Sequence, residues 1–341
     1  MHPRRQAVPS PGTADTLSTY TRAVPQPRAP SPLIIARRRA GHRRLALLVA
    51  GILLVIAFVV SIADRGHARK LQDKHKAHTH HVQLNPLTTA AVSRLIASRS
   101  GDVSAAVENL VTGHEWLLDA DARDQTASII KVDILETLLY QTEESGQPIS
   151  DAEGAEPQEM IEASDDDDAT ALWNQIGGAT GIGAYNASAG LTQTSPNTEG
   201  YWGETLTSGA DQIKILQQLA KPSRLLSPDA QEYALDLMTN IDPGQNWGVT
   251  GGVPAGVTVA LKNGWVPLTS GTDWEINSIG WVKGDGRDYL IAVLTAHDPS
   301  EQYGIRTIDE ISADVYSALG TTARGGAAKR RAGKTTTKKS V

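Results

Sequence analysis

Segments with a strand pattern stand at both ends of the folded part of this chain, and segments with a helix pattern stand between them. Early in the sequence, two apolar or alternating segments flank Thr112-Gly113, which is typical of a β-hairpin. Late in the sequence, β-branched apolar segments cover residues 257–265, 276–284 and 287–297. One antiparallel sheet must then be assembled from distant parts of the sequence. We therefore expect an α+β fold whose active site lies where the two halves meet.

The helix patterns define the middle of the chain. Residues 86–100 have a single apolar stripe, typical of a surface helix, whereas the helix that begins near Thr126 is apolar on most sides and should be buried. Further helices are predicted over residues 169–178, 210–220 and 305–319. These segments predict a central all-α subdomain.

An apolar run without a charged residue, 45–62, precedes the folded part. As a helix it would reach roughly 27 Å, enough to cross the hydrocarbon layer, and we predict a transmembrane helix over residues 45–63. Arginines are concentrated before the run, so the positive-inside bias places the N-terminus in the cytoplasm and the rest of the chain outside. A cleaved signal peptide is the alternative, because the small residues Ser61 and Ala63 suit a signal peptidase.

Composition sets the other boundaries. Residues 1–44 and 321–341 are basic and polar, so both are expected to be disordered tails. Residues 64–85 form a linker rich in His and Lys, typical of a mobile segment, although a metal could alternatively bind its histidines, which are His75, His78, His80 and His81. The domain proper, residues 86–320, is acidic: residues 82–321 hold 11 Lys or Arg against 35 Asp or Glu. Such a body repels phosphate backbones, which argues against nucleic acid as a partner.

The chain has no cysteine. This excludes disulfides, thiolate metal sites and cysteine nucleophiles. We expect no metal and no cofactor, and a monomer.

The first of three chemical motifs is on the buried helix. Ser128 and Lys131 are three residues apart, so their side chains share one face. A serine hydroxyl needs a base to become a nucleophile, and burial lowers the pKa of a lysine toward that task. Two weaker motifs follow in order, Ser164-Asp165-Asp166 at a helix start and Lys262-Asn263-Gly264 at a strand end. Taken singly, these are more typical of a helix cap and a turn.

Together, Ser-x-x-Lys, Ser-Asp-x and Lys-x-Gly in this order resemble the class A β-lactamases and penicillin-binding proteins, over roughly residues 87–320. The resemblance implies that Ser128 is acylated, that Lys131 is its base or proton relay, and that Ser164 carries a proton to the leaving nitrogen. It also implies an oxyanion hole made by the backbone N–H groups of Ser128 and Trp265. The substrate, a β-lactam or a cell-wall peptide, would then contact Asp166, Lys262, Asn263, Gly264 and Trp265, with Lys262 anchoring its carboxylate.

The sequence departs from the family pattern at three places. Asp166 stands where the family has asparagine, and an inward carboxylate would favour the charged form of Lys131. Asn263 replaces a threonine. The Glu-x-x-Leu-Asn segment whose glutamate activates the deacylating water is missing, with Leu191 near that glutamate's expected place. Glu199 and Glu204 follow it and are more typical of surface acids.

These observations predict a membrane-anchored extracytoplasmic serine hydrolase that is acylated at Ser128 and deacylates slowly. The alternative is a non-catalytic module that binds or senses peptidoglycan on the same fold. Trp202, Trp265, Trp274 and Trp281 either line the cleft or pack in the core.

Overall fold

The computed structural model describes residues 84–148, 154–269 and 272–335, with side chains as far as residue 320. The predicted transmembrane helix, the N-terminal tail and nearly all of the linker lie outside this part. Within the described residues, no helix combines the length and the apolar character that a membrane crossing requires.

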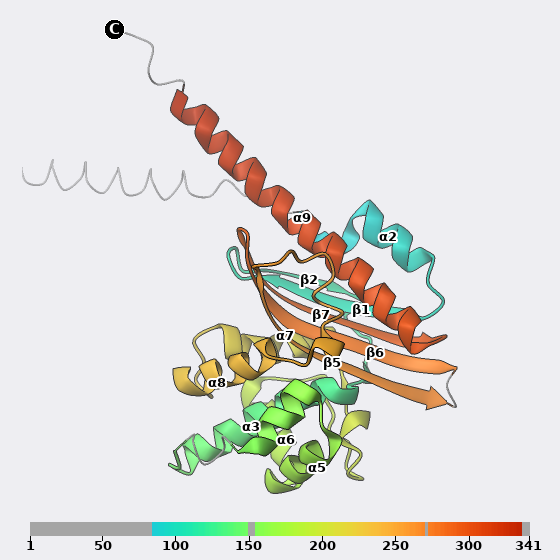
Figure 1. Ribbon diagram of the computed structural model, residues 1–341, viewed down its shortest axis with the longest axis vertical. Coiled ribbons are helices and arrows are strands. Elements are labelled where there is room, and N and C mark those ends of the chain that lie inside the picture. The colour runs from blue at the N-terminus through green and yellow to red at the C-terminus, as the bar shows by residue number, and fades with distance from the viewer. Residues whose placement is uncertain (1–83, 149–153, 270–271, 336–341) are drawn as a thin grey trace, which may run out of the picture. The chain divides into compact units, whose positions relative to one another are not determined.

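A five-stranded antiparallel sheet is the centre of the domain, in the order β2-β1-β7-β6-β5 (Figure 1). The N-terminal hairpin, β1 (Asp102–Asn109) and β2 (His114–Leu118), joins three strands from the end of the chain: β5 (Thr258–Thr269), β6 (Asp273–Gly284) and β7 (Arg287–Asp298). Because β1 pairs with β7, the two ends of the domain form one sheet. The α+β fold expected from the sequence is confirmed.

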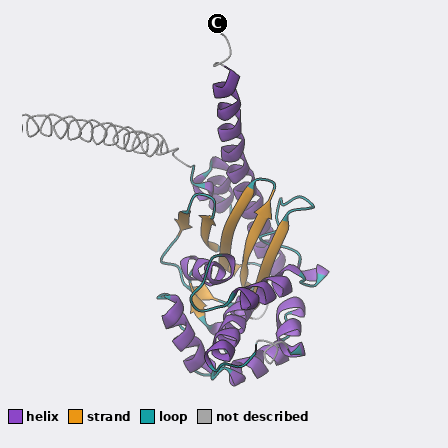
Figure 2. Cartoon of the chain, turned by 90° about the vertical axis from the view of Figure 1, so that its left-hand side faces the viewer, coloured by secondary structure: helices purple, strands orange, loops and turns teal. Residues whose placement is uncertain are grey.

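Helices cover both faces of this sheet (Figures 1 and 2). One face carries α2 (Ala90–Ala97), after the short η1 (Pro86–Thr88), and α9 (Glu301–Thr335). The other carries α7 (Gly209–Ala220) and α8 (Pro228–Thr239) and, with them, the helices α3 (Ile130–Glu144), α4 (Ala155–Gln158), η4 (Glu159–Ala163), α5 (Asp166–Gln175) and α6 (Gly178–Ala189). The side chains of β1 alternate accordingly. Val103, Ala105 and Val107 pack on the face that carries α9, and Ala106 packs on the opposite face, which carries α7 and α8.

Three elements differ from the sequence predictions. A small sheet of β3 (Asp124–Gln125) and β4 (Leu206–Thr207) is too short to have a recognisable pattern. The helix α6 is rich in glycine, yet Gly181 is required there, because a Cβ at that position would lie 1.8 Å from the carbonyl oxygen of Ile176. Finally, α9 continues past residue 319 to Thr335, through residues rich in the helix formers Ala, Lys and Arg, where we expected a disordered tail.

Candidate active site

Ser128 lies in a tight turn that begins the buried helix. The turn is η2 (Ala127–Ile129), which leads directly into α3, and the Ser128 side chain is partly exposed. The residue before it, Ala127, has a φ of 44°, a left-handed conformation that costs a non-glycine residue roughly 1–3 kcal/mol. Such strain persists only where the surroundings impose it, and here it sets the backbone conformation immediately before Ser128 and therefore the direction of the Ser128 side chain.

Gly264 of β5 packs directly against this turn. A Cβ on Gly264 would lie 2.8 Å from the backbone nitrogen of Ser128 and 2.8 Å from the carbonyl oxygen of Thr126. A side chain at this position is therefore sterically excluded. The close approach places the β5 backbone around Gly264 beside the N–H of Ser128, where an oxyanion hole would need it.

The Lys131 ammonium is buried one helical turn after Ser128, and it donates three hydrogen bonds. They go to the carbonyl oxygen of Ser164 (2.7 Å), the hydroxyl of Ser164 (3.1 Å) and Oδ1 of Asp166 (2.6 Å). Burial lowers the pKa of Lys131, and the Asp166 carboxylate raises it in part. The fold therefore brings Lys131, Ser164 and Asp166 together, as the sequence motifs predicted. The Asp166 carboxylate points toward Lys131, although most of the Asp166 side chain is exposed.

The second lysine reaches the same serine from the sheet. Lys262 on β5 is fully buried, and its Nζ lies 2.8 Å from the Ser164 hydroxyl and 3.2 Å from the carbonyl oxygen of Asn263. Burial and the nearby charge of Lys131 lower the pKa of Lys262 well below its usual range. The Ser164 hydroxyl thus stands between two amines whose protonated forms are both disfavoured, which is suited to passing a proton.

Ser164 itself is held in a left-handed conformation, with φ 62°, between the η4 turn and α5. The N-cap of α5 is the next residue, Asp165, whose side chain accepts from the N–H of Asp168. The capping interpretation of this motif therefore applies to Asp165. This leaves the Ser164 hydroxyl free to face the two lysines.

Asn263 turns its side chain away from the lysines. Its amide nitrogen donates to the carbonyl oxygens of Gln245 (2.7 Å) and Trp247 (3.2 Å), and its oxygen accepts from Ser278 (2.6 Å). The amide is thus fully occupied in holding the loop around η6 (Pro243–Gln245) against β5. Its predicted contact with substrate stays a prediction, and these bonds give it no support.

A cavity of about 550 Å³ lies between that loop and the Ser164 segment. Trp247 and Trp265 meet edge to face in its wall, with ring centroids 6.0 Å apart. Trp265 is one of the few large apolar side chains that are exposed among the described residues. The cavity therefore offers an aromatic surface beside the candidate proton carrier, which suits the body of an organic substrate.

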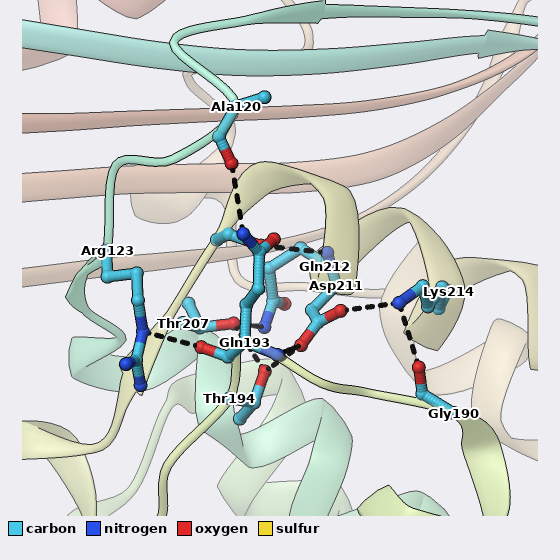
Figure 3. Close-up of polar contacts among 10 residues, drawn as sticks. Ala120, Arg123, Gly190, Gln193, Thr194, Thr207, Asp211, Gln212 and Lys214 are labelled. Atoms are coloured by element: carbon cyan, nitrogen blue, oxygen red, sulfur yellow. Dashed lines mark hydrogen bonds and ion pairs between the residues drawn. The ribbon is translucent and has the colours of Figure 1, made fainter.

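The loop before α7 follows a path that the sequence did not indicate. Leu191 is buried in the core under this loop, and Glu199 and Glu204 are exposed. Hydrogen bonds from the first residues of this loop hold it against α7 (Figure 3). The buried Asp211 carboxylate accepts hydrogen bonds from the N–H of Gln193 (2.6 Å) and from the Thr194 hydroxyl (3.0 Å). Lys214 joins Asp211 to the carbonyl oxygen of Gly190, at 2.8 Å from each.

Trp202 is the residue of this loop that reaches the site. It lies in η5 (Trp202–Glu204), its indole N–H donates to the Thr170 hydroxyl (3.1 Å), and the Lys131 ammonium lies 5.0 Å from its ring centroid. The loop thus presents an aromatic ring to Lys131. Sequence reasoning included Trp202 among four candidate cleft residues but had no signal to prefer it.

The comparisons with known proteins agree with this geometry. The model of the β-lactamase enzyme family matches residues 157–319, a range that contains the second and third motifs. A curated relative in Mycobacterium tuberculosis and Mycobacterium bovis, named "Putative lipoprotein LppW", is 30% identical over 223 residues, which are 63% of this chain and 69% of the relative.

The chain belongs to the β-lactamase enzyme family.

Solved structures of class A β-lactamases and of PBP-A share the fold. A class A β-lactamase from Mycobacterium abscessus is 21% identical, with a TM-score of 0.57 over 67% of this chain and 97% of the other. A class A β-lactamase from Bacteroides cellulosilyticus gives a TM-score of 0.60 at 17% identity, over 67% and 95%. The protein PBP-A gives 0.58 at 20% identity, over 67% and 94%.

Proposed function

We propose that this β-lactamase-family protein is a serine hydrolase that is acylated at Ser128 by β-lactams or D-alanyl peptides and releases the product slowly. The observation that carries the proposal is the position of the Ser164 hydroxyl, which lies 3.1 Å from Nζ of Lys131 on α3 and 2.8 Å from Nζ of Lys262 on β5. Two buried amines that share one hydroxyl form a relay for protons.

In the proposed acylation, the neutral form of Lys131 takes the proton of the Ser128 hydroxyl while Oγ bonds to the substrate carbonyl carbon. The carbonyl oxygen becomes an oxyanion that the N–H groups of Ser128 and Trp265 stabilise. The amide C–N bond then breaks, Ser164 gives its proton to the leaving nitrogen, and Ser164 regains a proton from Lys131. The negative charge of the substrate carboxylate favours the protonated form of Lys262 against the effect of burial, so the two groups attract each other, and the cavity beside Trp265 accommodates the substrate's body.

Slow release follows from what surrounds Lys131. The carboxylate that contacts it is Asp166, which is held at 2.6 Å by the ammonium, and the loop before α7 contributes the Trp202 ring. Neither group is a free base for a water molecule. A variant of PBP-A, whose fold this chain shares, has been solved as an acyl-enzyme complex with penicillin G.

A membrane tether is part of the proposal. The apolar residues 45–62 support one cytoplasm-to-outside crossing, and the mycobacterial relative carries the name of a lipoprotein, which supports membrane association. The acylation chemistry does not depend on the tether.

The second candidate function is a non-catalytic module that binds peptidoglycan. The ion pair between Lys131 and Asp166 favours it, because the carboxylate stabilises the ammonium form of Lys131, which has no lone pair to accept a proton from Ser128. Acylation separates the two functions, since only the hydrolase forms a covalent adduct.

The test is intact-protein mass spectrometry after exposure to penicillin, with Ser128→Ala as the matched variant. We expect one adduct per wild-type chain and none on Ser128→Ala, whose thermal transition should change by only a few degrees because one hydroxyl is removed from a partly exposed site. Labelling that persists in Ser128→Ala would refute the nucleophile. An unlabelled wild type that still binds peptidoglycan fragments would establish the binding module.

A further inference from the structure

The backbone that leads into Ser128 is held from the side by β6. The amide nitrogen of Asn277 donates to the carbonyl oxygens of Gln125 (2.8 Å) and Thr126 (3.1 Å), which are the residues just before the strained Ala127. On its other edge, the same segment pairs with β4, where the N–H of Thr126 donates to the carbonyl oxygen of Thr205 (2.8 Å). The position of Ser128 therefore depends on β6 as well as on its own helix.

Glu275 precedes Asn277 by two residues on β6, so both side chains leave the strand on the same face. Its side chain is only 6% exposed, and the backbone N–H of Gln125 faces its carboxylate. The pairing of β6 with β7 is irregular between Trp274 and Ile276, the neighbours of Glu275. The extra residue of this irregularity is on β7, and Glu275 keeps its regular pairing with Val266 of β5, so its carboxylate is buried on the same face of β6 as the Asn277 amide.

We propose that Glu275 is a positioning residue for the nucleophile, whose carboxylate holds the Gln125 N–H while Asn277 holds the Gln125 carbonyl oxygen. The two side chains thereby bind both polar groups of one residue in the segment that carries Ser128. The expected effect on the acylation rate rests on the proposed function of Ser128. The expected effect on the backbone before Ser128 rests on the geometry alone.

The charge of Glu275 should control how firmly the segment is held. Burial and the neighbouring Asp124 raise the pKa of Glu275 to about 7, against the opposing effects of the Gln125 N–H and His297, and Asp273 raises it further. These are the charged groups that face it, from β3, β7 and β6. An ionised carboxylate accepts a stronger hydrogen bond than a protonated one, so the segment is held more firmly above pH 7 and more loosely below.

One carboxylate oxygen of Glu275, Oε2, is buried without a hydrogen-bond partner among the described residues. The ionised form is therefore incompletely solvated, which is consistent with a group that gains and loses its proton near neutral pH.

The test compares wild type, Glu275→Gln and the control Glu115→Gln, which removes an exposed carboxylate from β2 of the same sheet. Penicillin acylation is followed by mass spectrometry between pH 5.5 and 8.5. At pH 8 we expect Glu275→Gln to be acylated roughly fivefold more slowly than wild type, because its neutral amide accepts a weaker hydrogen bond than the ionised carboxylate. At pH 5.5, where Glu275 is protonated, the two acylation rates should be equal. The control should keep the wild-type profile. Identical profiles for Glu275→Gln and wild type would overturn the inference.

Hydrogen exchange decides the same question without acylation. In wild type, peptides that cover residues 120–131 should gain protection between pH 6 and 8 after correction for intrinsic exchange, and Glu275→Gln should not show this gain if it folds. Protection that stays constant in wild type would refute the positioning role even where no variant can be purified. A wild type that shows the gain but is never acylated would support the inference and refute the proposed function.

Discussion

At the scale of single residues, the chemistry of the site depends on which groups accept hydrogen bonds from the Lys131 ammonium. Asp166 stands where the family has an asparagine, and its Oδ1 lies 2.6 Å from Lys131 Nζ. The carboxylate stabilises the charged form of Lys131, which as the proposed base must be neutral to act, so it opposes the effect of burial on the pKa of Lys131.

We expect Asp166→Asn to raise the acylation rate near pH 7, because removing the negative charge lowers the pKa of Lys131 further and increases its neutral fraction. Each pKa unit changes that fraction by about tenfold, so the pH profile of acylation should move to lower pH. Stopped-flow measurement with nitrocefin checks the shift. Asp167→Asn is the control, since this exposed neighbour on α5 should leave the profile unchanged. A slower reaction in Asp166→Asn would mean that the carboxylate has a role of its own.

Gly264→Ala should abolish acylation, because the new Cβ would lie 2.8 Å from backbone atoms of the Ser128 turn, and backbone cannot move aside as a flexible side chain can. Gly183→Ala on α6 is the matched control: its Cβ meets no atom within 4 Å, and alanine is favoured over glycine in a helix by roughly 0.5–1 kcal/mol. Penicillin labelling and thermal denaturation of both variants are the measurements. Full labelling of Gly264→Ala would show that β5 does not confine the turn.

At the scale of elements, we propose that the loop before α7 determines how long the acyl-enzyme lasts. It is anchored by Asp211 and presents Trp202 to Lys131, with no carboxylate of the loop in contact with that lysine. General-base assistance is typically worth about 10² to 10⁴ in rate, so its loss should leave a persistent ester.

A nitrocefin reaction should therefore show a burst of about one equivalent followed by a slow steady state, as expected when an acyl-enzyme accumulates. Rapid mixing with absorbance detection, together with mass spectrometry of the accumulated adduct, checks this. Rapid linear hydrolysis without a burst would point to Glu199 or Glu204 as a base brought in by a different loop conformation.

The elements also show where sequence reasoning succeeded. The hairpin at Gly113, the buried helix after Ser128 and the three long C-terminal strands have apolar patterns of several residues, and all were predicted close to their observed positions. The path of the loop before α7 was not, because it depends on hydrogen bonds from the buried Asp211, which have no sequence period. The inward direction of Asp166 was foreseen as one possibility. The direction of Asn263 was not, since it depends on backbone carbonyls of a distant loop.

At the scale of the whole molecule, buried carboxyl groups link stability to pH. Asp133 and Glu136 on α3 are both fully buried, and the Tyr185 hydroxyl donates to Glu136 at 2.7 Å. Burial raises the pKa of Asp133 to about 8, and it raises the pKa of Glu136 well above its usual value. In the folded state both groups therefore keep a proton that the unfolded chain has already lost at neutral pH.

The sign of the effect follows. Between the unfolded pKa of Asp133, near 4, and its folded pKa of about 8, the folded state binds the extra proton, so the free energy of unfolding falls as pH rises. We expect the thermal midpoint of wild type to decrease from pH 5 to pH 8, and Asp133→Asn to show a smaller decrease. Each kcal/mol corresponds to roughly 2–4 °C for a domain of this size. Scanning calorimetry of both proteins gives the comparison, and equal decreases would exclude Asp133 as the source.

The contact between Asn277 and Gln125 spans 152 positions of the chain, and Gly264 reaches Ser128 across a similar interval. As the chain emerges from its N-terminus, the serine is made long before the strands that confine it. A partly synthesised or truncated chain would then carry the proposed nucleophile without the strand that supplies Gly264 and Lys262, and we expect that it would not be acylated. Under the proposed function, covalent labelling by penicillin would accordingly count only molecules whose synthesis and folding are complete.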